Sequence, residues 1–225
     1  MKSHRIQSLP QFCLCLCFCL AISLFTQNVN AENDPLQMQF TELAPGVWLG
    51  NRPDSTRLPV TPNTTFVISE EGVVVFDGGN LPLVAERVIA KIRSLTDQPV
   101  THVVISHWHM DHVLGVARYL QAFPNVQVIA HPYSRELIFR DLAVNEQNMR
   151  NTVSDNRPGI ESLLASEKAA SLDARTVTWF RQFIEAADLL ERQYRNFEPA
   201  YPNLLISDAL TIQSGQREIR LLHPG

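Results

Sequence analysis

The chain of 225 residues has few cysteines, and all four lie close to its start. Cys13, Cys15, Cys17 and Cys19 fall inside one apolar run, where they act as small hydrophobic residues. If this run is removed, the remaining chain has no disulfide bond and no thiolate to offer a metal, even in an oxidising compartment. The sequence after this run therefore excludes a disulfide-stabilised scaffold and a cysteine-ligated metal site.

Basic residues are also scarce, and they form no cluster. The chain has 19 basic and 23 acidic residues; without Lys2 and Arg5 the count is 17 against 23, a net charge of −6. An acidic chain without a basic patch argues against nucleic acid as a partner. Internal repeats and low-complexity stretches are absent, and the 194 residues after Ala31 are enough for one domain with a sizeable core.

The first 31 residues have the pattern of a secretory signal peptide. Lys2 and Arg5 give a basic start, an apolar run spans 12–25, and residues 29–31 offer a cleavage site. The run is shorter than the about 20 residues of a membrane-spanning helix. We therefore predict a signal peptide at 1–31, a domain at 32–225, and a periplasmic or secreted protein with no stable membrane span. An uncleaved anchor is the alternative.

One stretch joins a buried strand to a cluster of metal-binding side chains. Residues 101–106 carry a β-branched, apolar centre, which indicates a strand buried on both faces. Four of the seven histidines fall within residues 102–112. His107 and His109 are two positions apart in an extended segment, so both should point to one side and bind one metal ion. A histidine-rich surface turn is the simpler alternative.

Asp111 and His112 follow directly after the two histidines. A carboxylate and an imidazole both suit zinc and other borderline divalent metals. We therefore predict that these two residues hold a second metal ion or a metal-bound water.

Another polar residue is expected at the same edge of the sheet. Residues 73–76 form a predicted strand that ends at Asp77, and a helix with Pro82 in its first turn precedes the strand at 101–106. This order is a βαβ unit with parallel strands, whose carboxyl ends gather functional residues. We predict that Asp77 hydrogen-bonds the histidine loop; a turn aspartate that caps the helix is the alternative.

The motif His107-x-His109-x-Asp111-His112, preceded by Asp77-Gly78-Gly79, resembles the signature of the metallo-β-lactamase superfamily. The resemblance implies an α/β fold, the amino-terminal half of a metallo-β-lactamase-type αβ/βα sandwich with an inserted helical segment. It also implies two zinc ions, with His107 and His109 on the first and with Asp111 and His112 on the second. Asp111 would be catalytic as well, orienting the attacking hydroxide.

The family chemistry implied is hydrolysis of a small-molecule ester, thioester, lactone or β-lactam by a metal-bound hydroxide. His112 and the lack of later cysteines disfavour the β-lactamases that use a cysteine ligand. All-histidine β-lactamases and glyoxalase-like thioesterases both fit, and export favours the former. An exported accessory hydrolase of quinoprotein systems has a similar helical insert. The alternative is a non-catalytic, truncated metal-binding remnant or accessory protein of a quinoprotein system.

The last residues, 220–225, resemble the segment that precedes the next ligand histidine in this family. We therefore expect an amino-terminal fragment: the remaining ligands would follow Gly225, the facing sheet would be mostly missing, and zinc binding would be weak. His131 and His223 are alternative ligands, although a turn residue and a strand-end residue are the simpler interpretations. His102 is expected to be a packed strand residue.

The remaining elements follow from periodicity and turn residues. Helices are predicted at 82–95, 115–121, 134–150 and 160–196, the last with a break near Asp173; a hairpin is predicted at 40–50, a loop at 51–62, and strands at 66–68, 126–130, 204–206, 210–213 and 218–222. Apolar residues between Phe180 and Phe197 line one face of the last helix. A core-covering helix is the simpler interpretation, and a lid for an apolar substrate is the alternative.

Overall fold

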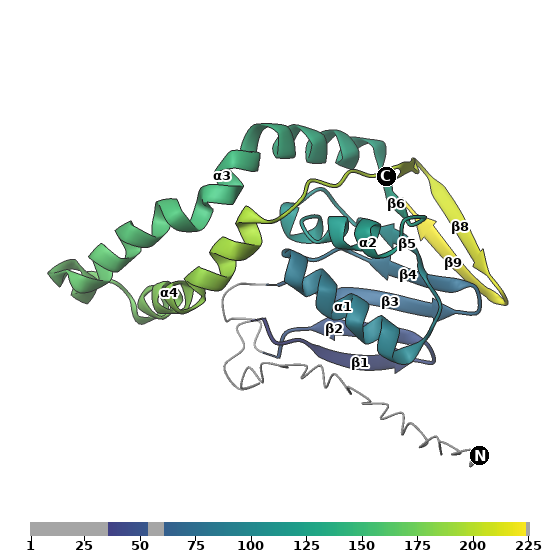
Figure 1. Ribbon diagram of the computed structural model, residues 1–225, viewed down its shortest axis with the longest axis horizontal. Coiled ribbons are helices and arrows are strands. Elements are labelled where there is room, and N and C mark those ends of the chain that lie inside the picture. Colours follow the sequence, from purple (N-terminus) through teal and green to yellow (C-terminus); the bar gives the residue numbers. More distant parts are fainter. Residues whose placement is uncertain (1–35, 54–60, 224–225) are drawn as a thin grey trace, which may run out of the picture.

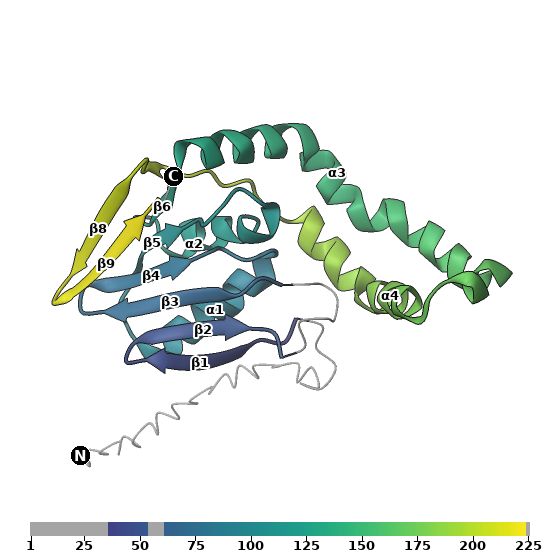
Figure 2. The same cartoon turned by 180° about the vertical axis from the view of Figure 1, so that it is seen from behind.

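The computed structural model describes residues 36–53 and 61–223, so the predicted signal peptide and most of the loop at 51–62 lie outside the described residues. The described chain forms a seven-stranded sheet in the order β1-β2-β3-β4-β5-β6-β7 and a separate hairpin, β8-β9 (Figures 1 and 2). The strands are β1 Gln39–Ala44, β2 Val47–Asn51, β3 Thr64–Ser69, β4 Gly72–Phe76, β5 Val100–Val104, β6 Gln127–Ala130, β7 Leu204–Leu205, β8 Ala209–Ser214 and β9 Arg217–Leu222. The predicted α/β class is confirmed.

The first four strands are antiparallel, and the next three continue the sheet in parallel. The turn between β1 and β2 uses Gly46 at φ +73°, a conformation that costs glycine little. Between β4 and β5 the chain crosses over through α1 (Pro82–Leu95), which begins with the predicted proline. This crossover brings the carboxyl ends of β4 and β5 to the same edge of the sheet.

Alternate residues of the central strands face two different cores. Val75, Val103 and Val128 pack under α1 and α2 (Val116–Ala122), which cover one face of the sheet (Figure 1). Their neighbours Val104 and Ile129 face the hairpin β8-β9 on the opposite side. A fully buried valine or isoleucine side chain contributes about 1.5–3 kcal/mol, so the two cores together fix the strand ends.

The hairpin β8-β9 covers part of the sheet face opposite α1 and α2, where most of the facing sheet was expected to be missing. Ile212 of β8 and Leu221 of β9 are 7% exposed and pack against the sheet. The hydroxyl of Ser69, at the end of β3, forms a hydrogen bond of 2.6 Å with the hydroxyl of Ser214, which ties the hairpin to the sheet edge. In the described residues, this second face therefore has one antiparallel hairpin as its cover.

The helical segment differs from the prediction. The first helix was predicted to end at residue 150, but α3 (Pro132–Ala165) continues through Pro158 to Ala165. A 3-10 turn at Glu167–Ser171 and α4 (Ala174–Arg195) follow. The break near Asp173 is confirmed: Asp173 caps α4 by accepting from the backbone N–H of Thr176 at 2.9 Å. In Figures 1 and 2 the two helices project from the sheet body as an antiparallel pair. Across the described residues, none of the helices is long and apolar enough to span a membrane.

Candidate metal centre

The two loops that follow β4 and β5 are joined by backbone hydrogen bonds. The N–H of Asp77 donates to the carbonyl of Val104 at 2.8 Å, and the N–H of Gly78 donates to the carbonyl of His112 at 2.9 Å. Further along, the N–H of Gly115 donates to the carbonyl of Gly79 at 3.0 Å. The motif loop is therefore held against the end of β4 at both its start and its finish.

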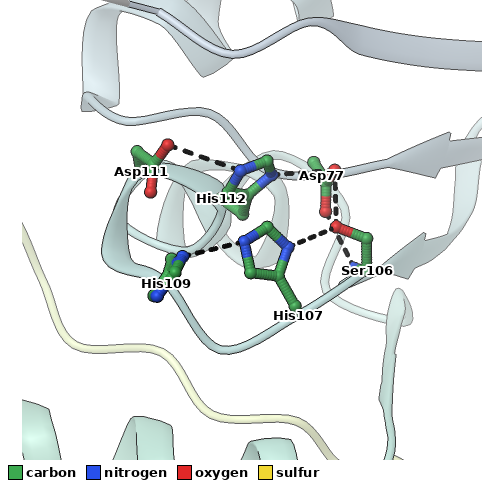
Figure 3. A network of polar contacts seen from close by, with 6 residues as sticks. All are labelled: Asp77, Ser106, His107, His109, Asp111 and His112. Carbon is green, nitrogen blue, oxygen red and sulfur yellow. Dashed lines mark hydrogen bonds and ion pairs between the residues drawn. The ribbon is translucent and has the colours of Figure 1, made fainter.

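Asp77 is the centre of the polar contacts in this site (Figure 3). It is the one non-glycine among the described residues with positive φ, at 67°, and its carboxylate faces the histidine loop. Oδ1 accepts from the backbone N–H of Ser106 at 2.8 Å, and Oδ2 accepts from the Ser106 hydroxyl at 2.9 Å. Nδ1 of His112 lies 2.9 Å from the same Oδ2. The structure therefore places Asp77 against the loop and not at the start of α1.

Ser106, which the sequence did not single out, determines the tautomer of His107. Its hydroxyl donates to Asp77, so its oxygen is left to accept from Nδ1–H of His107, 3.0 Å away. With the proton on Nδ1, Nε2 of His107 carries a free lone pair. Ser106 lies directly before the motif, and this position is the one sequence signal that could have identified it.

His107 and His109 present two different ring nitrogens to each other. Nε2 of His107 lies 3.0 Å from Nδ1 of His109, and the ring centroids are 4.7 Å apart (Figure 3). Burial, followed by the charges of His112 and His109, lowers the pKa of His107 and favours its neutral form. A neutral imidazole is the form that binds a metal ion.

Asp111 and His112 form the second pair of the motif, on the 3-10 turn Met110–His112. Nε2 of His112 lies 3.4 Å from Oδ2 of Asp111, and the two histidine rings of His107 and His112 are 4.1 Å apart. Because Nδ1 of His112 faces Asp77, Nε2 is the nitrogen turned toward Asp111. All four predicted ligands thus gather at the end of β5.

The spacing of these donor atoms fits zinc. Two nitrogens at 2.0–2.1 Å from one tetrahedral zinc lie about 3.3 Å apart, close to the 3.0 Å between His107 and His109. A carboxylate behind a ligand histidine, as Asp77 stands behind His112, is the usual support for such a ligand. Within residues 36–53 and 61–223, however, no set of three or more such side chains already converges as a metal site. The loop thus offers donor atoms in pairs.

The three described histidines outside the motif, His102, His131 and His223, contact residues other than the motif. His131 caps α3, its Nδ1 accepting from the N–H of Tyr133 at 3.2 Å, and its ring stacks on His223 at 4.2 Å. His102 lies in β5 between the side chains of Thr101 and Gln127, at 2.9 and 3.1 Å. The structure does not bring these residues into the pairs formed by the motif.

Two comparisons with known proteins give partial similarities. A metallo-beta-lactamase from Pontibacter korlensis superposes with a TM-score of 0.51 at 18% identity, covering 84% of this chain and 61% of that one. A linear primary-alkylsulfatase from Pseudomonas is 32% identical over 50 residues, which is 22% of this chain and 10% of that enzyme. The chain therefore spans about three fifths of the first protein and a tenth of the second.

The family assignment rests on a broader match. The sequence profile of the metallo-beta-lactamase superfamily matches residues 57–193, more than half of the chain. The match begins ahead of β3 and ends near the end of α4, and it includes Asp77 and the whole histidine motif. On this match and on the shared fold, the chain belongs to the metallo-beta-lactamase superfamily.

Proposed function

We propose that this protein is an exported, zinc-dependent hydrolase that acts on the carbonyl of a small-molecule ester, thioester, lactone or β-lactam. The observation that carries the proposal is the arrangement of the motif: Nε2 of His107 and Nδ1 of His109 face each other at 3.0 Å. Asp111 and His112 form a second pair beside them, held from behind by Asp77. Metal-assisted hydrolysis is the chemistry that such a donor set supports best.

Each residue then has a distinct task. His107 and His109 bind the first zinc ion, and Asp111 and His112 bind the second. When bound, zinc supplies a Lewis acid for the carbonyl oxygen and lowers the pKa of a coordinated water to about 7. The Asp111 carboxylate, half exposed at 51%, would orient the attacking hydroxide. Asp77 fixes His112 through Nδ1 and so leaves Nε2 for the metal.

Export is a separate part of the proposal, supported by the basic start and apolar run of residues 1–31. Mass spectrometry of the protein recovered outside the cytoplasm should show a new amino terminus near Glu32. An intact Met1 on protein from the cytoplasm would contradict export.

Replacing Asp111 by Asn tests the hydrolase proposal. Asparagine keeps the size and one oxygen acceptor but removes the charge. Zinc content should fall below that of the wild type, and hydrolysis of a chromogenic ester or lactam should slow by about 10²–10³-fold, as for other lost electrostatic groups. Elemental analysis and steady-state rates are measured on the same preparations. Full zinc content with near-normal turnover would show that Asp111 is only a turn residue.

Metal binding without turnover is the second candidate function. It is favoured by the number of donors: a catalytic zinc usually has three protein ligands, and the described residues present two for each position. This candidate predicts measurable zinc binding by the 225-residue chain with no hydrolysis of any ester, thioester, lactone or lactam. Hydrolysis that depends on added zinc would exclude it.

The similarity to the alkylsulfatase covers too little of that enzyme to support an alkyl sulfate as the substrate of this protein.

A further inference from the structure

An apolar cavity opens beside the metal-binding motif. Its volume is about 360 Å³, within the range of roughly 300–1,000 Å³ for small-molecule sites. The residues that define it come from the motif loop and from both long helices: Met110, Asp111, Met149, Trp179, Phe183 and Tyr194. The cavity therefore joins the helical segment to the candidate metal centre.

The cavity has one charged end and apolar walls. Among the described residues that line the cavity, Asp111 of the motif is the charged one. The apolar walls include Met149 from α3 and Trp179 and Phe183 from α4. Methionine and aromatic side chains bind apolar groups of varied shape. A molecule that fills this space would place a polar group at Asp111 and an apolar group between the helices.

Trp179 is an exposed aromatic side chain in the wall of the cavity. It is 43% exposed, and its ring stacks on Phe183 with centroids 6.2 Å apart and planes 14° from parallel. The side of α4 that faces the protein core is provided by other residues, among them Ala186 and Ala187, which are at most 1% exposed. An exposed tryptophan that continues a buried aromatic wall is typical of a binding surface.

The helices that carry these residues are fixed to the body. The side-chain oxygen of Gln193 on α4 accepts from the N–H of Leu83 on α1 at 2.8 Å. Arg150 on α3 donates to the carbonyl of Arg195 at the end of α4, at 2.6 Å. The cavity walls are thus held in place relative to Asp111 by contacts other than the cavity lining itself.

We infer that this cavity holds the alkyl or acyl chain of the substrate, with the scissile carbonyl at Asp111 and the histidine pair. The inference deepens the proposed function and rests on it for the carbonyl end. It assigns the substrate class as esters, thioesters or lactones that carry an apolar chain. It also assigns α3 and α4 a role in selecting the substrate.

Binding of simple alcohols to the metal-free protein tests the cavity without any catalysis. Isothermal titration with 1-butanol, 1-hexanol and 1-octanol should show affinity rising by up to about fourfold per methylene. Trp179→Ala should weaken 1-octanol binding by about tenfold. Phe139→Ala, a matched control on α3 that is 59% exposed and packs on Tyr201 instead, should leave it unchanged.

A second variant fills the space in place of opening it. Thr152 lines the cavity from α3 and is only partly buried, so Thr152→Phe should fold and should exclude 1-octanol. Equal 1-octanol binding by wild type, Trp179→Ala and Thr152→Phe, or an affinity that does not change with chain length, would overturn the inference. Circular dichroism of each variant confirms that the fold is retained.

Hydrolysis of p-nitrophenyl esters by the zinc-loaded protein then separates the two proposals. With acetate, butyrate, hexanoate and octanoate esters, KM should fall as the chain lengthens, and Trp179→Ala should flatten this dependence. If alcohols bind as predicted and no ester is hydrolysed, the proposed function is wrong and the cavity stands. If esters are hydrolysed without any dependence on chain length, the cavity inference is wrong and the proposed function stands.

Discussion

The sheet body and the helical segment of this protein contribute differently to the site. In the body, side chains from two strand ends converge because parallel strands end at the same edge, and hydrogen bonds of 2.8–3.0 Å join their loops. The helical segment α3–α4 contains none of the four motif ligands, but it supplies most of the apolar wall beside Asp111. On the proposed function, the body would carry out the chemistry and the helices would select the substrate that reaches it.

One glycine in each region tests this difference, Gly115 in the body and Gly159 in the helical segment. Replacing Gly115 should have the largest effect on stability. A Cβ on Gly115, three residues after the motif, would lie 2.1 Å from the carbonyl oxygen of Gly78 and 2.9 Å from the Ala85 side chain. Because backbone must move to relieve this contact, Gly115→Ala should destabilise the protein by about 3 kcal/mol. Chemical denaturation followed by circular dichroism measures the change.

The matched change in the helical segment should have the opposite sign. A Cβ on Gly159 of α3 meets nothing within 4 Å, so Gly159→Ala should stabilise the helix by about 0.5–1 kcal/mol. If the two alanine variants shift the denaturation midpoint equally, the tight junction between the motif loop and β4 is not what the structure indicates.

Much of the body could be predicted from the sequence because each element has a local cause. The apolar centre of residues 101–106 indicated a buried strand, and Pro82 marked the start of α1. The position of Asp77 followed from the βαβ order, which puts it at the same sheet edge as His107. Its positive φ and its contact with the Ser106 hydroxyl depend on the two loops meeting, so no local pattern predicts them.

The helical segment was predicted less well because its structure depends on contacts between distant residues. Separate helices were predicted at 134–150 and 160–196, yet α3 continues across the gap between them, with Pro158 and Gly159 inside the helix. The ion pair of Arg150 with Glu146 supports the helix before them, and the ion pair of Arg157 with Glu161 spans them. Val153 is fully buried against α4. The cavity could not be predicted either, since its walls lie on two helices whose packing no periodicity specifies.

Asp77→Asn should have a smaller effect than the glycine change and should act on the site alone. Asparagine tolerates positive φ, so the backbone can keep its conformation, but the charge facing His112 is lost. Loss of such a supporting carboxylate typically lowers metal affinity by about 10–100-fold. Competition with a chromogenic zinc chelator measures the affinity of the variant and of the wild type.

The control for this change lies in the helical segment. Asp173→Asn at the start of α4 removes the same charge from an exposed cap that asparagine also fills. It should leave zinc affinity unaltered. Equal zinc affinity of Asp77→Asn and wild type would show that Asp77 supports the loop structurally and not the metal.

Zinc titration decides whether the strand-end loop binds zinc through His107 and His109. Zinc is titrated into three proteins in the presence of a competing chelator: the wild type, the double variant His107→Ala/His109→Ala and the control His102→Gln. His102 lies in β5, outside the motif. We expect wild type and His102→Gln to bind zinc with equal affinity and the double variant to lose at least about 100-fold in zinc affinity. Unchanged zinc binding by the double variant would contradict this expectation.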